Sequence, residues 1–276
     1  MKRILIIGGS GFLGRALFKE LHPYFDVYAT YCNQERYANN KRYFEYDIQE
    51  DAPTAILKHI KPDIIISALR GDAAAQFIAH DMIISYAMQN EKRIIFLSSA
   101  NVYDSFRHYP SYEHDKTLSE STYGKLKIKL ENKILRMPPF SWTIGRIPMV
   151  FGSASPRLKE IKACIKTQNP YEVFPNTVIN VAVDYLLTQQ LHYIINKNLW
   201  GVFHLGSTDL IHHDEFIAEI VRGMESKYQL KYKHVYTSNN DRYIAVLPKF
   251  NKLPKHLNYT TKDVVKETLK NILSKQ

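Results

Sequence analysis

The chain begins with the stretch that decides its fold, which reads Ile4-Leu5-Ile6-Ile7-Gly8-Gly9-Ser10-Gly11-Phe12-Leu13-Gly14. An apolar run leads directly into a glycine-rich turn, and a helical pattern follows. Glycine allows the positive φ of a tight turn, lets the backbone approach a phosphate, and lets the helix pack closely on the strand. Amide groups at the start of that helix then face the phosphate oxygens. The stretch therefore predicts a strand, turn and helix that hold the pyrophosphate of a dinucleotide.

Apolar β-type runs alternate with helical stretches through the first 150 residues. The expected strands cover residues 3–7, 27–30, 43–45, 63–67, 93–98 and 142–147. The expected helices cover residues 11–21, 53–60, 72–89 and 118–135, with Pro53 in a first turn and Asp72 as an N-cap. Nearly continuous apolar strands are typical of a parallel sheet buried on both faces. The pattern predicts an α/β fold with a Rossmann-type, doubly wound parallel sheet.

The regular alternation of apolar strands and helices changes near residue 150. Beyond it we expect helices at 156–167, 181–196, 214–224 and 261–274, and short strands at 171–174 and 202–205. We therefore expect an NAD(P)-binding Rossmann domain over residues 1–150 and a smaller C-terminal α/β substrate-binding lobe over residues 151–276. Because no linker rich in proline, glycine or serine separates them, the two should be interleaved.

Composition narrows the class of protein. The 276 residues suffice for a large core, and 45% hydrophobic with 23% charged residues is ordinary for a globular protein. No apolar stretch approaches the roughly 20 residues that cross a membrane, so we expect no membrane partner. Met1 leads within two residues into the first strand, which predicts a cytoplasmic protein. Cys32 and Cys164 are far apart and lack metal-ligand spacing, so we expect reduced thiols and no metal site.

The net charge of +10 is distributed along the chain. Its densest stretch, residues 125–136, has the pattern of the solvated face of a helix, so we expect no nucleic-acid partner. A basic surface instead suits an anionic cofactor and an anionic nucleotide-sugar substrate.

The end of the second strand bears on the choice of cofactor. An acidic residue that binds the adenosine ribose usually stands there in NAD sites, but Thr30 occupies the end of this strand. Arg36 follows and favours the 2′-phosphate of NADP(H), whereas Glu35 could reach the ribose and leaves NAD(H) possible. Asp47 and Ile48 follow the third strand, where they either meet the adenine or begin a helix.

A second motif lies far along the chain, where Tyr123 and Lys127 share one helix face at i and i+4. A nearby ammonium favours the phenolate and is expected to lower the tyrosine pKa from about 10. The tyrosine can then donate a proton to an alkoxide that forms during hydride addition. The fifth strand ends in Ser98-Ser99, and the Ser99 hydroxyl could orient the substrate oxygen. These residues predict a proton-transfer site.

Taken together, the motifs resemble those of the extended short-chain dehydrogenase/reductase family. They are Gly8-x-x-Gly11-x-x-Gly14, Asp47-Ile48, Ser98-Ser99-x-x-Val102-Tyr103, Tyr123-x-x-x-Lys127 and Gly145-Arg146-Ile147-Pro148-x-Val150-Phe151-Gly152. Phe12-Leu13-Gly14, Val102-Tyr103-Asp104, Pro175-Asn176-Thr177 and residues 201–205 resemble in particular the dTDP-4-dehydrorhamnose reductase branch. That branch reduces a 4-keto group on a nucleotide-linked deoxysugar, usually with NADPH.

The resemblance implies an NAD(P)-dependent oxidoreductase with Ser99, Tyr123 and Lys127 as catalytic residues. The candidate cofactor-binding residues are Gly8, Ser10, Gly11, Phe12, Leu13, Gly14, Thr30, Arg36, Asp47, Ile48, Ala68, Leu69, Arg70, Ser98 and Arg146. The candidate substrate-binding residues are Val102, Tyr103, His108 and Arg157.

Arg70 departs from the family pattern, which often has Asn-Ala-Ala after the fourth strand. It is expected either to touch phosphate or substrate, or to form a surface ion pair with Asp72. Two other functions stay open on the same scaffold, an NAD-dependent nucleotide-sugar epimerase and a non-catalytic NAD(P)-binding regulatory subunit. Ala100-Asn101 after Ser99 argues against a dehydratase. A homodimer is also possible.

Overall fold

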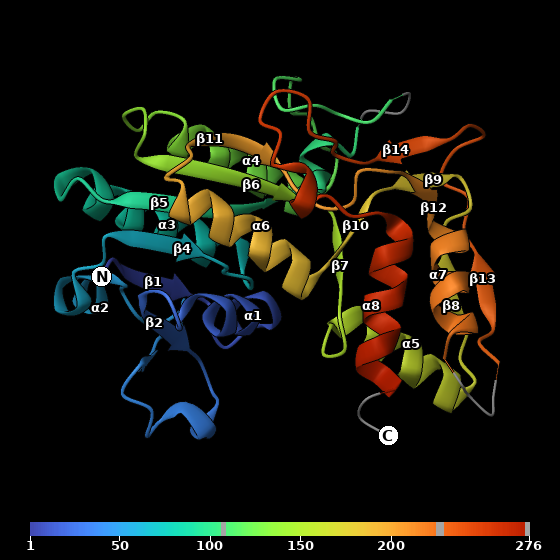
Figure 1. Cartoon of the computed structure of the whole chain (residues 1–276), viewed down its shortest axis with the longest axis horizontal. Coiled ribbons are helices and arrows are strands. Elements are labelled where there is room, and N and C mark those ends of the chain that lie inside the picture. The colour runs from blue at the N-terminus through green and yellow to red at the C-terminus, as the bar shows by residue number, and fades with distance from the viewer. Residues whose placement is uncertain (106–108, 225–228, 274–276) are drawn as a thin grey trace.

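A seven-stranded parallel sheet forms the centre of the molecule, as the computed structural model shows (Figure 1). The structure describes residues 1–105, 109–224 and 229–273. The strand order is β11-β6-β5-β4-β1-β2-β3. The strands are β1 (Arg3–Ile7), β2 (Asp26–Tyr31), β3 (Tyr43–Glu45), β4 (Ile64–Ser67), β5 (Arg93–Ser99), β6 (Trp142–Ile147) and β11 (Gly201–His204). The order reverses between β1 and β4, which confirms the doubly wound Rossmann-type sheet.

Helices cover both faces of this sheet, because successive side chains of each strand point to opposite sides. Ile4 and Ile6 pack in one core with α1 (Phe12–Leu21) and α6 (Asp184–Asn196). Leu5 and Ile7 pack in a second core with α2 (Thr54–Ile60), α3 (Ala73–Gln89) and α4 (Thr122–Ile134). All four strand residues are at most 1% exposed, as expected for a parallel strand between two helical layers.

In the described residues, the smaller lobe combines short strands with three α-helices beside the carboxyl edge of the sheet (Figure 1). Its helices are α5 (Pro156–Thr167), α7 (His213–Arg222) and α8 (Thr261–Leu273). Its strands are β7 (Met149–Phe151), β8 (Tyr171–Val173), β9 (Thr177–Ile179), β10 (Val181–Val183), β12 (Ile211–His212), β13 (Tyr232–His234) and β14 (Arg242–Ile244). They pair as β7–β10, β8–β13 and β12–β9–β14.

Two expected helices begin three or more residues later than the sequence pattern indicated. The helix expected from residue 118 begins at Thr122, because the Ser121 hydroxyl accepts a hydrogen bond of 3.1 Å from the Gly124 N–H and caps it. The helix expected from residue 181 begins at Asp184, because residues 181–183 pair with β7 as β10. Asp72 caps α3 as expected, whereas Pro53 is the N-cap of α2 and lies just before its first turn.

The chain crosses between the two lobes more than once. The strand expected in the smaller lobe, β11, pairs with β6 in the central sheet, and α6 packs against α1. The boundary at residue 150 therefore stays a prediction about where the smaller lobe begins. Within the described ranges, no helix is both long enough and apolar enough to span a membrane.

Candidate active site

A cavity of about 1170 Å³ lies where the carboxyl ends of the strands face the smaller lobe. Its wall includes residues at or just beyond the carboxyl ends of β1, β2, β4, β5 and β6, such as Gly8, Ala68 and Ser99, and residues of the lobe, such as Arg157 and His213. The crevice outside the carboxyl ends of the strands, at the point where the strand order reverses, is where doubly wound sheets bind ligands.

The glycine-rich turn forms one end of this cavity. Gly8 has a φ of +88°, and its N–H donates a hydrogen bond of 2.9 Å to Oγ1 of Thr30. The Ser10 N–H donates to the Thr30 carbonyl at 3.0 Å, so the end of β2 holds the turn in place. A Cβ on Gly14 would clash with the Gly8 carbonyl, which explains the third glycine of the motif.

The start of α1 fits the diphosphate of a dinucleotide. Its N-cap, Gly11, offers no side chain, whereas Asp72, Ser121 and Ser155 cap α3, α4 and α5 through their side chains. Ser10, Gly11, Phe12, Leu13 and Gly14 all line the cavity. Helix-start amides without a side-chain cap, beside a backbone free of Cβ atoms, suit phosphate oxygens. A bound nicotinamide dinucleotide would therefore place its diphosphate here.

Only some of the other expected cofactor-binding residues line the cavity. The residues Thr30, Asp47, Ile48, Ala68, Leu69, Arg70 and Ser98 line the cavity. Arg36 does not; its guanidinium donates to Gln34 at 2.9 Å and lies over the Tyr37 ring at 4.8 Å. The preference for NADP(H) over NAD(H) rested on Arg36, so it stays a prediction.

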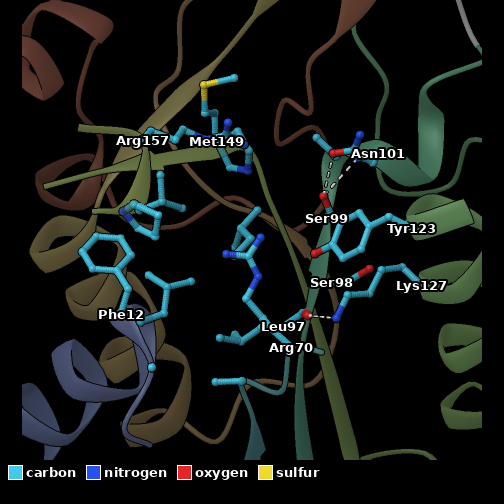
Figure 2. A pocket seen from close by; sticks show the side chains of 18 of the residues that line it. Phe12, Arg70, Leu97, Ser98, Ser99, Asn101, Tyr123, Lys127, Met149 and Arg157 are labelled. Carbon is cyan, nitrogen blue, oxygen red and sulfur yellow. Dashed lines mark hydrogen bonds between the residues drawn. The ribbon is translucent and has the colours of Figure 1, made fainter. Parts of the chain in front are cut away.

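Ser99, Tyr123 and Lys127 lie together at the other end of the cavity, as Figure 2 shows. The Ser99 hydroxyl donates to Oδ1 of Asn101 at 3.0 Å and accepts from the Asn101 N–H at 3.2 Å. Lys127 is buried, and its ammonium donates to the Leu97 carbonyl at 3.2 Å. Its Nζ lies 5.6 Å from the centre of the Tyr123 ring. The Tyr123 side chain is 39% exposed, so a ligand in the cavity can reach it.

The electrostatics of these groups differ from the expectation. Burial raises the pKa of Tyr123 above its usual value, and the charges of Arg70 and Arg157 and a hydrogen bond with Ser99 only partly oppose it. Burial, with the charge of Arg70, lowers the pKa of Lys127 to about 8, against the pull of Glu131. The expectation of a lowered tyrosine pKa is therefore wrong in this arrangement, because the effect of burial exceeds that of the nearby cations.

Arg70 and Arg157 both line the cavity. Figure 2 shows Arg70 rising into the space between Phe12 and Tyr123. The alternative of a surface ion pair between Arg70 and Asp72 is wrong, because the described residues show no such pair within 4.0 Å; the Asp72 carboxylate instead caps α3 by accepting a hydrogen bond of 2.9 Å from the Ala75 N–H.

Three other expected site residues lie outside the cavity. Arg146 is 3% exposed and forms an ion pair with Glu131, whose carboxylate also accepts a hydrogen bond from Ser98. Val102 and Tyr103 are fully buried, and the Tyr103 hydroxyl accepts a hydrogen bond from Arg146 and donates to the Tyr112 carbonyl. These three residues support the site from behind and are not available to a ligand. His108 lies outside the described residues.

Sequence reasoning missed two residues that shape the site. Gly124 packs so closely on Ser119 and the Asn101 carbonyl that a Cβ would clash with both, and this contact sets the start of α4 beside Ser99. His213 is 4% exposed and lines the cavity, and its Nδ1 accepts a hydrogen bond of 3.3 Å from the Phe174 N–H. Its Nε2 therefore carries the proton of the neutral ring. The only sequence signal for Gly124 was its place directly after Tyr123. No sequence signal pointed to His213.

The comparison with known families agrees with this geometry. The model of the family described as "RmlD substrate binding domain" matches residues 1–253. The chain belongs to this family. The resemblance to extended short-chain dehydrogenase/reductases that the motifs indicated is confirmed.

Solved structures share the fold over nearly the whole chain. A dTDP-4-dehydrorhamnose reductase of Bacillus anthracis str. Ames in complex with NADP has a TM-score of 0.76 at 17% identity, and the match covers 97% of this chain and 99% of that one. A UDP-glucose 4-epimerase of Thermus thermophilus in complex with NAD has a TM-score of 0.80 at 12% identity, covering 98% and 99%. At these identities the likeness shows the fold alone.

A curated relative matches part of the chain. Methionine adenosyltransferase 2 subunit beta of Danio rerio is 27% identical over 164 residues. The match spans 55% of this chain and about half, 49%, of that protein.

Proposed function

We propose that this protein is an NAD(P)-dependent oxidoreductase that reduces a keto group on a nucleotide-linked deoxysugar. One observation carries the proposal: Ser99, Tyr123 and Lys127 lie in the same cavity as the glycine-rich turn. The family membership and the names of the solved structures supply the substrate class, because they act on nucleotide-linked sugars such as dTDP-4-dehydrorhamnose and UDP-glucose.

In the proposed reaction, a bound nicotinamide supplies the hydride. Tyr123 donates its proton to the oxygen that becomes an alkoxide, and its raised pKa keeps it protonated at neutral pH, as a donor requires. Ser99 turns its hydroxyl proton from Asn101 to the substrate oxygen and so orients the ketone. Lys127, fixed by the Leu97 carbonyl, stabilises the phenolate that remains after the proton has left.

The experiment is oxidation of NADPH and of NADH against a panel of nucleotide-linked 4-keto-6-deoxy sugars. Tyr123→Phe should lower turnover by about a thousandfold, because a positioned acid contributes on the order of 10² to 10⁴ in rate. Its affinity for the cofactor should not change. Tyr236→Phe, at a tyrosine that is 69% exposed and outside the cavity lining, is the matched control. A Tyr123→Phe variant that keeps most of the turnover would refute the mechanism.

The relative from Danio rerio favours a second candidate, a non-catalytic regulatory subunit that binds NAD(P). Such a protein would bind the cofactor but turn over no member of the panel. Cofactor that copurifies and survives dialysis would instead favour an epimerase, which retains its NAD through the cycle. A cytoplasmic location and a homodimer remain predictions.

A further inference from the structure

A second cavity lies at the edge of the central sheet, beside β6, β11 and α4 (Figure 1). Its volume is about 650 Å³, within the range of roughly 300–1,000 Å³ that is typical of small-molecule sites. Its wall combines residues 113–117 with the C-terminal part of α4 and with parts of β6 and β11. Among the described residues, it shares no lining residue with the cavity of the proposed reaction. The proposed reaction therefore leaves this cavity unused.

Both tryptophans of the chain lie in the wall of the second cavity. Trp142 begins β6, and Trp200 lies directly before β11. Their rings meet edge to face, with 5.9 Å between the centroids. Trp200 is 39% exposed, so part of its ring is open to a ligand. An open indole ring offers an apolar face on which the C–H groups of a ring-shaped ligand can pack.

The wall also offers hydrogen-bonding groups, and one of them is a buried donor without a partner. Trp142 is 8% exposed, and its indole N–H donates to no residue that the structure describes. A buried indole N–H usually has a hydrogen-bond partner. Asn132 and Thr117 add an amide and a hydroxyl to the same wall. This combination suits a ligand that carries several hydroxyl groups.

The buried charges of the wall are already compensated. Glu131 pairs with Arg146 at 2.7 Å. The Glu113 carboxylate accepts hydrogen bonds of 3.0 to 3.3 Å from the backbone N–H groups of residues 249–251. Residues 115–116, an exposed aspartate and an exposed lysine, carry opposite charges. A charged ligand would therefore lose hydration without gaining a buried partner, whereas a neutral ligand does not carry this cost.

We propose that the second cavity binds a neutral saccharide. A sugar ring combines C–H groups, which pack on the open face of Trp200, with hydroxyl groups, which accept from the indole N–H of Trp142 and bond to Asn132. The site does not rest on the proposed function, because the two cavities have separate walls. They are neighbours, since Glu131 in this wall accepts a hydrogen bond from Ser98 in the other.

The test is titration of the wild-type protein with D-glucose, N-acetyl-D-glucosamine and maltose, followed by tryptophan fluorescence. Because the chain has only these two tryptophans, the emission reports on the surroundings of this cavity. At least one of the three sugars should give a saturable change with a Kd of about 1 mM or below. Glucosamine, glucuronate and cyclohexanol are matched in ring size, and each should bind at least about tenfold more weakly.

Calorimetry of variants locates the site. Trp200→Ala removes the open indole face and should weaken binding of the best sugar by about tenfold. Trp142→Phe keeps an aromatic ring but removes the N–H, and it should also weaken binding by about tenfold. Tyr24→Ala, at a tyrosine that is 61% exposed and outside the lining of both cavities, should leave binding unchanged. Tyr123→Phe should also leave it unchanged, because Tyr123 lines the other cavity.

Four outcomes would overturn the proposal. In the first, none of the three neutral sugars binds. In the second, glucosamine or glucuronate binds as tightly as the neutral sugars, so that the site selects a charge. In the third, cyclohexanol binds as tightly as glucose, so that the cavity is only an apolar pocket. In the fourth, sugar binding is lost in Tyr123→Phe and kept in Trp200→Ala, which places the sugar in the other cavity.

Discussion

Glu131 and Arg146 form a buried ion pair, with 2.7 Å between Oε2 of the glutamate and Nη2 of the arginine. Glu131 lies one and two helical turns beyond Lys127 and Tyr123, on the same face of α4. It also accepts a hydrogen bond from Ser98, next to Ser99 of the proposed site. One carboxylate thus joins α4, β5 and β6 behind the proposed site.

Glu131→Ala should lower the free energy of unfolding by about 3 kcal/mol, because it leaves a buried guanidinium without its partner. The measurement is urea denaturation. Replacing both members, as in Glu131→Met with Arg146→Met, should recover part of the loss, since the buried guanidinium is then removed together with its partner. A loss below about 1 kcal/mol in the single variant would mean that water reaches Arg146.

Turnover should fall as the pH rises through about 8, because the Lys127 ammonium has its pKa lowered to about 8 and loses its charge there. Arg70 contributes to this lowering, so its removal raises the pKa of Lys127. The alkaline limb of kcat should therefore move to higher pH in Arg70→Gln. Lys125→Gln, an exposed residue of the same helix, is the control. If the alkaline limb of kcat did not move in Arg70→Gln, the charge of Arg70 would not act on the group that titrates.

Gly124→Ala should impair both stability and turnover. The new Cβ would meet Ser119 and the Asn101 carbonyl, so the start of α4 must move away from Ser99. Overpacking of this kind costs about 1–3 kcal/mol. Thermal denaturation and kcat measure the two effects, and Lys125→Ala provides the matched substitution on the exposed face. Wild-type turnover in Gly124→Ala would show that the close contact does not position Tyr123.

Acid should destabilise the protein through three buried histidines. Burial lowers the pKa of His80, His204 and His213 to about 4. The unfolded chain takes up these protons near pH 6.5, before the folded one does, so stability is full above pH 6.5 and falls toward pH 4. Urea denaturation at pH 7.5 and pH 5 should differ by about 2 kcal/mol for each histidine.

The variant His80→Leu tests how much of this loss of stability at low pH comes from one histidine. His80→Leu should reduce the difference between the two pH values, because the His80 ring no longer titrates. His22→Leu, at an exposed histidine, should leave the difference unchanged. Equal stability of wild type at both pH values would contradict the buried, neutral state of these rings.

The sequence predicted the sheet and much of the cavity wall, because local patterns encode both. A buried parallel strand is an apolar run, and a phosphate-binding turn needs glycines at fixed spacing. Ser99, Tyr123 and Lys127 could be predicted because a strand end and one helix face fix their places. The short strand β10 could not, because its pairing with β7 joins residues about thirty positions apart and overrides local helix propensity.

Long-range pairing also explains the misplaced site residues. Arg146 ends in a structural ion pair because Glu131, on another element, lies within reach of it. No feature of the sequence near Arg146 indicates that Glu131 is its partner. His213 is the opposite case, because the sequence did not indicate it as a site residue. It lines the cavity because the short strands of the smaller lobe pair in the folded chain.

The return of the chain to the central sheet has a consequence for how the protein can be divided. A fragment that stopped at residue 150 would lack β11, so the hydrogen-bonding groups of β6 on that side would be unpaired, and it would lack α6, so the apolar side of α1 would face water. Such a fragment is expected to aggregate rather than fold, because an open apolar edge strand recruits other chains. Residues 1–150 therefore cannot be moved to another protein as an independent domain. Any fusion or circular permutation must keep residues 184–204 with them.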